Sequence, residues 1–361
     1  MKSVALIISY IDKLAIISLM NKDVKRIAIV RLSALGDIVN SAVVLQFIKK
    51  QFPHAKIEWI TEGMFAPLLQ NHPLIDVVHS VKIKKIKKEK SLSLLKDTIS
   101  YLKALGKFDI IIDMQGLIKS AVVSRIIGKN THGFDKNSTR EGLASFFYKT
   151  TSNIPYDENI LKRNCFVVAD ALGFKITDEM LLNKSKVFPC SEYPHMPERS
   201  DEYSLGTKND KKNIAIVIGA SWESKKYKKE NIAKLCDELQ ENCLILWGNE
   251  DEKADGMWIC ENSKYATLAP KLSLIELISF IDSCDLLIGN DTGPTHMAWA
   301  QNIPSITLFG PTTTRMIYET PKNIGIKSPS KVDIFKIDKN DFSIKDIKVQ
   351  TIVKRAKELL K

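Results

Sequence analysis

The residues best suited to chemistry lie in the stretch 285–312, where an apolar run is followed by a polar, glycine-containing loop. Leu286–Ile288 predicts a buried strand, and Asp291-Thr292-Gly293-Pro294 predicts the start of a helix over residues 296–301. Asp and Thr oxygens can cap a first helical turn, and Pro suits its first position. Such a helix start at the end of a strand can also bind an anion through its free N–H groups. The stretch therefore predicts either an anion site or an ordinary capped turn, with a second strand at Ser305–Phe309.

Asp37 is the second candidate, because it lies where a predicted strand ends and a predicted helix begins. Arg26–Arg31 has the apolar run of a buried strand, and an apolar stripe predicts a helix from about residue 38 to 52. The side chain of Asp37 could cap this helix, or it could serve as a carboxylate base at the edge of the sheet. The loop contains Gly36 but no GxGxxG, which disfavours a dinucleotide-binding dehydrogenase.

Composition limits the class of protein and the kind of partner. The 361 residues suffice for two domains, and 44% hydrophobic with 26% charged residues is typical of a globular protein. The net charge of +11 predicts anionic partners, such as nucleic acid, phosphorylated substrates or an anionic membrane surface. The six cysteines form no CxxC and no His–Cys spacing, so we expect buried thiols in a reducing compartment and no metal site.

Residues 1–24 form a segment of their own. Val4–Ile11 and Leu14–Met20 are apolar, but Asp12-Lys13 interrupts them and no small-residue cleavage site follows. The segment is too short and too broken for a spanning helix. We expect an N-terminal extension with the working start at Met20, and a membrane anchor is the alternative.

Strand and helix patterns alternate through both halves of the chain. The first half predicts strands at 56–60, 75–81 and 108–114, and helices at 65–71, 92–105 and 159–172. After a polar, proline-containing stretch, the second half predicts strands at 214–218 and 244–247, helices at 229–240 and 250–260, and a capping box at Ser273-Leu274-Ile275-Glu276. We therefore expect an α/β protein with Rossmann-like βαβ domains at 25–195 and 196–343, a C-terminal helix at 344–361, and a substrate cleft between the domains.

Two basic features could contact a large anionic substrate. Lys82–Lys90 contains six lysines and one glutamate, and it is either a solvated face or a grip on phosphates or lipid head groups. Arg140 could pair with Glu141 or with a helix end, or it could bind an anion through its guanidinium fork.

The chain carries, in order, Ser33-Ala34-Leu35-Gly36-Asp37, Asp113-Met114-Gln115-Gly116-Leu117-Ile118-Lys119-Ser120, Arg140-Glu141-Gly142-Leu143-Ala144, Phe146-Phe147-Tyr148, Trp247-Gly248, Asp291-Thr292-Gly293 with His296, and Gly310-Pro311-Thr312. In combination and in this order, these motifs resemble glycosyltransferase family 9, the lipopolysaccharide heptosyltransferases, from about Arg26 to the C-terminus. The resemblance implies the GT-B architecture, in which two Rossmann-like domains face each other across a cleft and the C-terminal helix returns to the first domain. It also implies transfer of L-glycero-D-manno-heptose from ADP-heptose to Kdo of Kdo-lipid A, with inversion and without a metal or cofactor.

The same resemblance assigns residues to the donor. It implies that Asp37 is the general base and that ADP-heptose is bound by Ala220, Ser221, Lys225, Glu252, Leu272, Asp291, Thr292, Gly293 and His296. Lys225 matches the phosphate lysine of the family, Glu252 the acid that contacts ribose, and Leu272 the position beside adenine. Ala220 and Ser221 stand where a pair of threonines is more usual, so Ala220 would act through its backbone N–H. His296 could face the same ligand or belong to the core.

On the acceptor side, the resemblance implies Lys84, Lys85, Lys87, Lys88, Gln115 and Arg140. The lysines stand where relatives are rich in arginine, so phosphate binding should be looser. Because Kdo-lipid A is embedded in the cytoplasmic leaflet, we expect a peripheral protein at the cytoplasmic face of the inner membrane. One alternative is heptosyltransferase II or another GT-B enzyme with a different nucleotide sugar. The other is a non-enzymatic nucleic-acid-binding protein, which is disfavoured because Lys82–Lys90 lacks interleaved aromatic residues.

Overall fold

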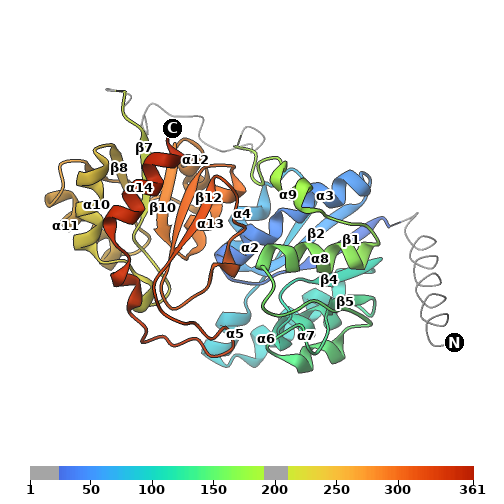
Figure 1. Ribbon diagram of the computed structural model, residues 1–361. Helices are drawn as coiled ribbons and strands as arrows, with labels where there is room; N and C mark the ends of the chain where they lie inside the picture. Colours follow the sequence, from blue (N-terminus) through green and yellow to red (C-terminus); the bar gives the residue numbers. More distant parts are fainter. Residues whose placement is uncertain (1–23, 191–209) are drawn as a thin grey trace. The chain divides into compact units, whose positions relative to one another are not determined.

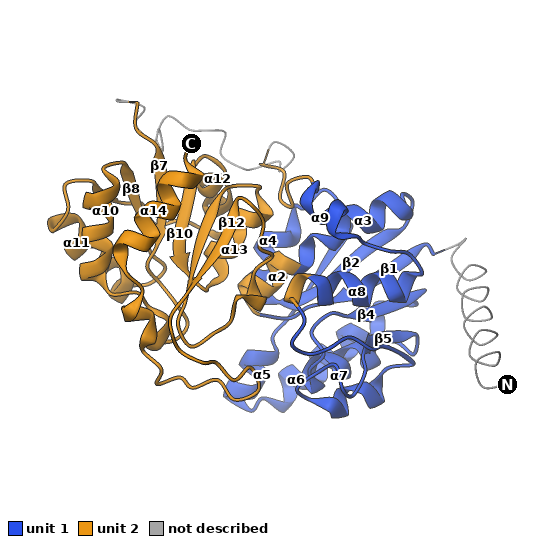
Figure 2. Cartoon of the chain, viewed as in Figure 1, with its two compact units in different colours: residues 1–33, 41–158, 162–184 blue, residues 34–40, 159–161, 185–361 orange. Residues whose placement is uncertain are grey.

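The computed structural model describes residues 24–190 and 210–361, which divide into two compact units (Figures 1 and 2). The first unit comprises the described part of 1–33 with 41–158 and 162–184, and the second comprises 34–40, 159–161 and the described part of 185–361. Residues 1–23 of the predicted extension and the predicted boundary after residue 195 lie outside the described residues. The sequence does not predict that the short segment 34–40, which carries Asp37, belongs to the second unit.

The first unit is built on a six-stranded parallel sheet. Its strands pair in the order β3-β2-β1-β4-β5-β6. Their bounds are β1 (Arg26–Val30), β2 (Lys56–Glu62), β3 (Val77–Val81), β4 (Ile110–Asp113), β5 (Thr131–Phe134) and β6 (Thr150–Ser152). Central strands are buried on both faces, which explains why β1 is a continuous apolar run instead of an alternating pattern.

Helices lie between these strands in the chain, and two more follow β6. They are α2 (Leu35–Ala42), α3 (Val44–Gln51), α4 (Ala66–Gln70), α5 (Ile83–Glu89), α6 (Leu92–Ala104), α7 (Ile118–Ile127), α8 (Ile160–Leu172) and α9 (Asp178–Leu182), with short 3₁₀ turns η2 (Gly63–Phe65) and η3 (Gly142–Phe147). The prediction of one helix over 38–52 was wrong in its start and its continuity. The helix begins at Leu35 because the carboxylate of Asp37 accepts the N–H of Ala34 (3.2 Å), and it is interrupted at Val43.

The second unit repeats the same plan. Its strands are β7 (Asn213–Val217), β8 (Asn242–Leu246), β9 (Ala266–Leu268), β10 (Leu286–Asn290), β11 (Ser305–Phe309) and β12 (Asn323–Lys327), and they pair in the order β12-β11-β10-β7-β8-β9. Its helices are α10 (Lys229–Leu239), α11 (Glu250–Glu261), α12 (Leu274–Asp282), α13 (Gly293–Ala300) and α14 (Val349–Leu359), with 3₁₀ turns η6 (Glu223–Lys225), η7 (Thr314–Met316) and η8 (Ser343–Asp346). The predicted capping box of α12 is confirmed, because Ser273 and Glu276 exchange both hydrogen bonds.

Both sheets have the doubly wound order 3-2-1-4-5-6 when the strands of each are counted along the chain. In such sheets, the connections from two neighbouring central strands run to opposite faces and leave a crevice at the carboxyl ends of those strands. This switch point lies between β1 and β4 in the first unit, and between β7 and β10 in the second. The fold therefore marks four loops as the places for ligands.

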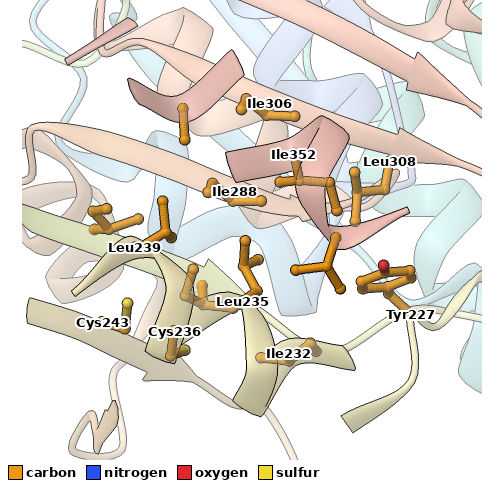
Figure 3. Close-up of a cluster of buried hydrophobic side chains, with 14 of the residues drawn as sticks. Tyr227, Ile232, Leu235, Cys236, Leu239, Cys243, Ile288, Ile306, Leu308 and Ile352 are labelled. Carbon is orange, nitrogen blue, oxygen red and sulfur yellow. The ribbon is translucent and has the colours of Figure 1, made fainter. Parts of the chain in front are cut away.

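The core of the second unit corrects one prediction. Alternate strand residues such as Ile288, Ile306 and Leu308 form one buried cluster with Leu235 and Cys236 of α10 (Figure 3). Val349, Ile352, Val353 and Ala356 of α14 belong to this cluster, and α14 packs along α10. The C-terminal helix therefore completes the core of the second unit, and its expected return to the first domain stays a prediction. It begins at Val349 instead of residue 344, because Ser343–Asp346 forms the 3₁₀ turn η8.

The cysteines are all free thiols, as expected from their spacing. Cys165, Cys236, Cys243 and Cys284 are buried, whereas Cys190 and Cys260 are half-buried. Within residues 24–190 and 210–361, the chain forms no helix with the length and apolar character needed to cross a membrane.

Candidate active site

The loops that follow β7 and β10 lie at the switch point of the second unit. We call residues 219–226 and 291–293 the donor-side loops, after the role that the family resemblance implies for them. Asn290, the buried last residue of β10, holds them together. Its Nδ2 donates to the carbonyl of Ile218 (2.9 Å), and its Oδ1 accepts the N–H of Tyr227 (3.0 Å). Ala220 is half-buried and Ser221 is exposed at the start of the first loop. Their backbone groups therefore lie at the carboxyl end of the central strands.

Asp291 is the centre of a buried polar network in these loops. Its carboxylate accepts hydrogen bonds from Nζ of Lys225 and Oγ1 of Thr312, each at 2.8 Å, and lies 3.3 Å from Nε2 of His296. Burial alone would raise the pKa of Asp291, but the hydrogen bond with His296 and the charge of Lys225 outweigh it and hold the pKa well below its ordinary value. The carboxylate is therefore ionised at neutral pH and fixes the ammonium of Lys225 in place.

This network corrects the expected capping role of the Asp-Thr pair. Thr292 is the N-cap residue of α13, but its side chain makes no capping hydrogen bond. The carboxylate of Asp291 is occupied by Lys225 and Thr312 instead of by the first helical turn. The helix begins at Gly293 with Pro294 in its first turn, as the sequence predicts for proline.

Glu252 and Leu272 lie on neighbouring elements of the second unit. Asn249 caps α11 by accepting the N–H of Glu252 (3.0 Å), and Oε2 of Glu252 accepts the N–H of Gly248 (2.7 Å). A Cβ placed on Gly219 would lie 2.5 Å from Oε1 of Glu252, so this carboxylate rests directly on the first donor-side loop. Leu272 is half-buried just before α12.

Asp37 occupies the third position of α2, and its side chain is half-buried. One carboxylate oxygen accepts the N–H of Ala34 at 3.2 Å, so the residue has a capping role. This hydrogen bond uses one oxygen, and a carboxylate that accepts an N–H can still take a proton. The capping role of Asp37 is therefore compatible with a role as general base.

The first turn of α2 packs against α13 within the second unit. A Cβ placed on Gly36 would lie 2.5 Å from Cδ2 of His296, and a Cβ placed on Gly293 would lie 2.7 Å from the side chain of Leu35. Both positions need glycine for this close approach. His296 is 5% exposed, so it packs between the Asp37-bearing turn and the buried network.

Within the first unit, the loop after β4 is held by the side chain of Asp113. Its Oδ1 accepts the N–H groups of Gln115 (2.8 Å) and Gly116 (3.1 Å), and its Oδ2 accepts the hydroxyl of Tyr148 (2.8 Å). Burial raises the pKa values of Asp113 and Tyr148. Oε1 of Gln115 accepts the N–H of Leu32 (2.9 Å), and this bond ties the loops after β1 and β4 together.

The predicted acceptor residues of the first unit are otherwise exposed. Lys84, Lys85, Lys87 and Lys88 all project from α5 into solvent. Arg140 is also exposed, and the neighbouring Glu141 contacts a helix start, accepting the N–H of Ile118 at the beginning of α7 (2.8 Å). Among the described residues, Arg140 therefore forms neither of the two structural contacts that its sequence position allows, with Glu141 or with a helix end.

Sequence reasoning missed several polar residues at the switch points. The sequence motifs contain Thr312, Asp113 and Tyr148 but assign no role to them. Lys119 is half-buried with Nζ 3.2 Å from Oγ of Ser33, and burial lowers its pKa. Their only signal in the sequence was their place directly after predicted strands or within the quoted motifs. Among the described residues, no group of three or more His, Cys, Asp or Glu side chains could hold a metal ion.

Two doubly wound sheets with polar loops at their switch points define an α/β protein of the GT-B fold. The family model for glycosyltransferase family 9 (heptosyltransferase) matches residues 99–331, and the chain belongs to this family. It is therefore a glycosyltransferase, and the alternative of a non-enzymatic nucleic-acid-binding protein is removed.

Individual relatives refine the comparison. The chain is 41% identical to lipopolysaccharide heptosyltransferase 1 of Campylobacter coli over 345 residues, covering 92% of this chain and 98% of the relative. It is 25% identical to lipooligosaccharide heptosyltransferase 2 of Campylobacter jejuni over 344 residues, covering 91% and 96%. Its fold matches that of the E. coli heptosyltransferase WaaC with ADP-2-deoxy-2-fluoro heptose, with a TM-score of 0.75 and 22% identity over 92% of this chain and 99% of that one.

Proposed function

We propose that the protein catalyses the heptosyltransferase I reaction of lipopolysaccharide inner-core synthesis. L-glycero-D-manno-heptose would pass from ADP-heptose to Kdo of Kdo-lipid A, with inversion and without a metal or cofactor. The Campylobacter coli relative, named lipopolysaccharide heptosyltransferase 1, supports this choice over heptosyltransferase II through its higher identity of 41% against 25%. The observation that carries the proposal is the packing of the Asp37-bearing turn on α13, beside the Asp291–Lys225 ion pair. Contacts within the second unit therefore link the proposed base, Asp37, to the proposed phosphate-binding cation, Lys225.

In the proposed reaction, the carboxylate of Asp37 takes the proton of the Kdo hydroxyl as the hydroxyl oxygen attacks the anomeric carbon of heptose. The bond from that carbon to the β-phosphate oxygen breaks on the opposite face, and ADP leaves with the bonding electrons. A positioned general base contributes about 10²–10⁴-fold to such a step. Negative charge grows on the leaving diphosphate, so fixed cations and backbone N–H groups must be in place beforehand.

The donor roles follow from the positions on the second unit. Lys225 and the N–H groups of Ala220, Ser221, Thr292 and Gly293 are proposed to bind the diphosphate. Asp291 keeps the ammonium of Lys225 in position, and His296 braces the turn of α2. Glu252 is proposed to accept hydrogen bonds from ribose hydroxyls, and Leu272 to pack beside adenine. On the first unit, Gln115 and Arg140 are proposed to contact Kdo and its neighbouring anionic groups.

One assay tests the reaction as a whole. Purified protein is incubated with ADP-heptose and Kdo-lipid A, and the product is read by mass spectrometry as the addition of one heptose. A second acceptor that already carries the first heptose separates the two family activities. Transfer only to the second acceptor would contradict the proposal and assign the heptosyltransferase II reaction to the protein instead.

The identity of the nucleotide gives a separate prediction. ADP should raise the thermal unfolding temperature more than UDP at equal concentration, because Leu272 is proposed to pack beside adenine. The ribose that Glu252 is proposed to bind is common to both nucleotides. Ligand at 100 times its Kd stabilises a folded protein by about 2.7 kcal/mol, which is a shift of several degrees. Differential scanning fluorimetry measures the difference. Equal or greater protection by UDP would contradict the proposed donor.

The surface around α5 supports a membrane partner. Nζ of Lys84 lies 3.5 Å from Sδ of Met64, which is 61% exposed. Directly after α5, Leu92 and Leu95 are 79% and 39% exposed at the start of α6. We call Met64, Lys84, Lys85, Lys87, Lys88, Leu92 and Leu95 the α5 surface. Exposed lysines beside exposed apolar side chains suit the anionic cytoplasmic face of the inner membrane, where each lysine contributes about 1 kcal/mol.

Binding to vesicles tests this partner. Replacing Leu92 and Leu95 together by Ser should lower partitioning onto phosphatidylglycerol vesicles by about tenfold or more, because insertion of two leucines is lost. Binding of the unaltered protein should also weaken with salt. Leu182→Ser is the matched control, since Leu182 is 55% exposed on α9, which is not part of the α5 surface. Equal binding of the double variant, or equal binding to phosphatidylcholine, would contradict the proposed surface.

A further inference from the structure

The lysines of the donor-side loops are largely compensated by carboxylates. Lys225 pairs with Asp291 at 2.8 Å, and Lys226 pairs with Glu223 at 2.7 Å. Just beyond the loop, Lys229 pairs with a carboxylate of α11 at 2.9 Å. The lysines within the donor-side loops therefore contribute little net positive charge. A leaving nucleoside diphosphate adds two to three negative charges, so an uncompensated cation is needed nearby.

Trp222 brings a further lysine to this loop. The indole of Trp222 lies in the first donor-side loop, and Nζ of Lys225 is 5.4 Å from the ring centroid. Nζ of Lys339 lies 5.0 Å from the same centroid, although it comes from the distant segment between β12 and η8. The turn η8, which follows this segment, packs against η6. An aromatic face attracts an ammonium group without neutralising its charge.

The carboxylates closest to Lys339 in the chain are committed elsewhere. Oδ1 of Asp338 accepts the N–H of Asn340 (2.8 Å), and Asp341 accepts the hydroxyl of Ser330 (2.6 Å). Within residues 24–190 and 210–361, Lys339 forms no ion pair with a carboxylate, and it is exposed. Its charge is therefore available to a ligand at the loop.

We propose that Lys339 is a second diphosphate-binding cation of the donor site, held at the loop by Trp222. The ligand class is a nucleoside diphosphate, with contact to the terminal phosphate that leaves with the bonding electrons. The proposal rests on the proposed function only in taking the second unit as the donor side. Lys225 is compensated by Asp291, so Lys339 supplies net positive charge that the buried pair does not.

The test compares ADP, AMP and inorganic pyrophosphate by titration calorimetry. Lys339→Gln should weaken ADP and pyrophosphate binding by about tenfold and AMP binding by less than twofold, because the second phosphate carries the contact. Lys339→Arg should restore ADP binding to within about threefold. Lys336→Gln, in the same exposed segment, is the matched control and should bind all three probes as the unaltered protein does.

Two substitutions of Trp222 distinguish the positioning of Lys339 by the indole from the charge that Lys339 itself supplies. Trp222→Phe should retain most ADP affinity, whereas Trp222→Ala should behave like Lys339→Gln. The proposal is overturned if Lys339→Gln binds ADP within twofold of the unaltered protein, or if it loses ADP and AMP equally. Pyrophosphate has neither a base nor a sugar. Its binding therefore tests the role of Lys339 whichever nucleotide the donor carries. Failure of the proposed function would appear in the ADP and UDP comparison instead.

Discussion

Asp37→Asn is expected to lower kcat by about 100-fold or more, because the base that takes the acceptor proton is lost. Asn keeps the size of the side chain and can still accept the N–H of Ala34, which Asp37 accepts at 3.2 Å. The start of α2 and its packing on α13 should therefore persist. Steady-state kinetics with ADP-heptose and Kdo-lipid A measure the loss, and ADP affinity should stay within about twofold.

Glu276→Gln is a matched control for this variant. Glu276 occupies the third position of α12 and accepts the N–H of the N-cap residue Ser273 at 2.7 Å, as Asp37 does at the start of α2. It shares the capping role and has no proposed role in the reaction. Glu276→Gln should therefore cost stability of about 1 kcal/mol or less and leave kcat unchanged. Near-normal turnover of Asp37→Asn would restrict Asp37 to the capping role.

Asp291→Asn has the second large expected effect, because it leaves the buried ammonium of Lys225 without its anionic partner. Breaking a buried ion pair from one side costs about 3–5 kcal/mol. The side chains of Lys225 and Asp291 are 11% and 4% exposed, so solvent cannot compensate the loss. Urea unfolding followed by tryptophan fluorescence measures it, since the second unit holds Trp222, Trp247, Trp258 and Trp299. ADP affinity should fall as well, because Lys225 is no longer fixed.

The effect of Asp291→Asn should depend on pH. The folded state holds the pKa of Asp291 below the unfolded value of about 3.9, so the unfolded chain binds the proton more readily. The stabilisation is therefore complete above the unfolded pKa and is lost as pH falls through the folded pKa. The difference between the unaltered protein and the variant should shrink from about pH 5 downwards.

An exposed pair provides the comparison. Lys162 and Asp178 lie 3.0 Å apart, with side chains 41% and 59% exposed. Asp178→Asn should change stability by less than about 1 kcal/mol at any pH. A small effect of Asp291→Asn at neutral pH, equal to that of Asp178→Asn, would show that the buried network does not hold Lys225.

Much of the local structure was predictable because it depends on neighbours in the chain. The apolar runs of β1 and β10, the stripe of α10 and the capping box at Ser273 are all set within a few residues. The motifs that resemble family 9 also identified the loops that the fold places at the switch points. Helix boundaries were less predictable, as the start of α2 at Leu35 shows, because a single side-chain hydrogen bond moves them.

The amino-acid sequence by itself determined the alternation of strands and helices, the chemical type of each candidate side chain and the family. Only the tertiary structure decided which loops meet. Asp291 has the residue type and position of a helix cap, yet it pairs with Lys225, 66 residues away, because β7 and β10 are neighbours in the sheet. Likewise, the apolar face of α14 could pack on any hydrophobic surface, and the apolar side chains of α10 determined where it packs. Strand order and helix docking depend on burying surfaces that are distant in the chain, and no local pattern specifies that choice.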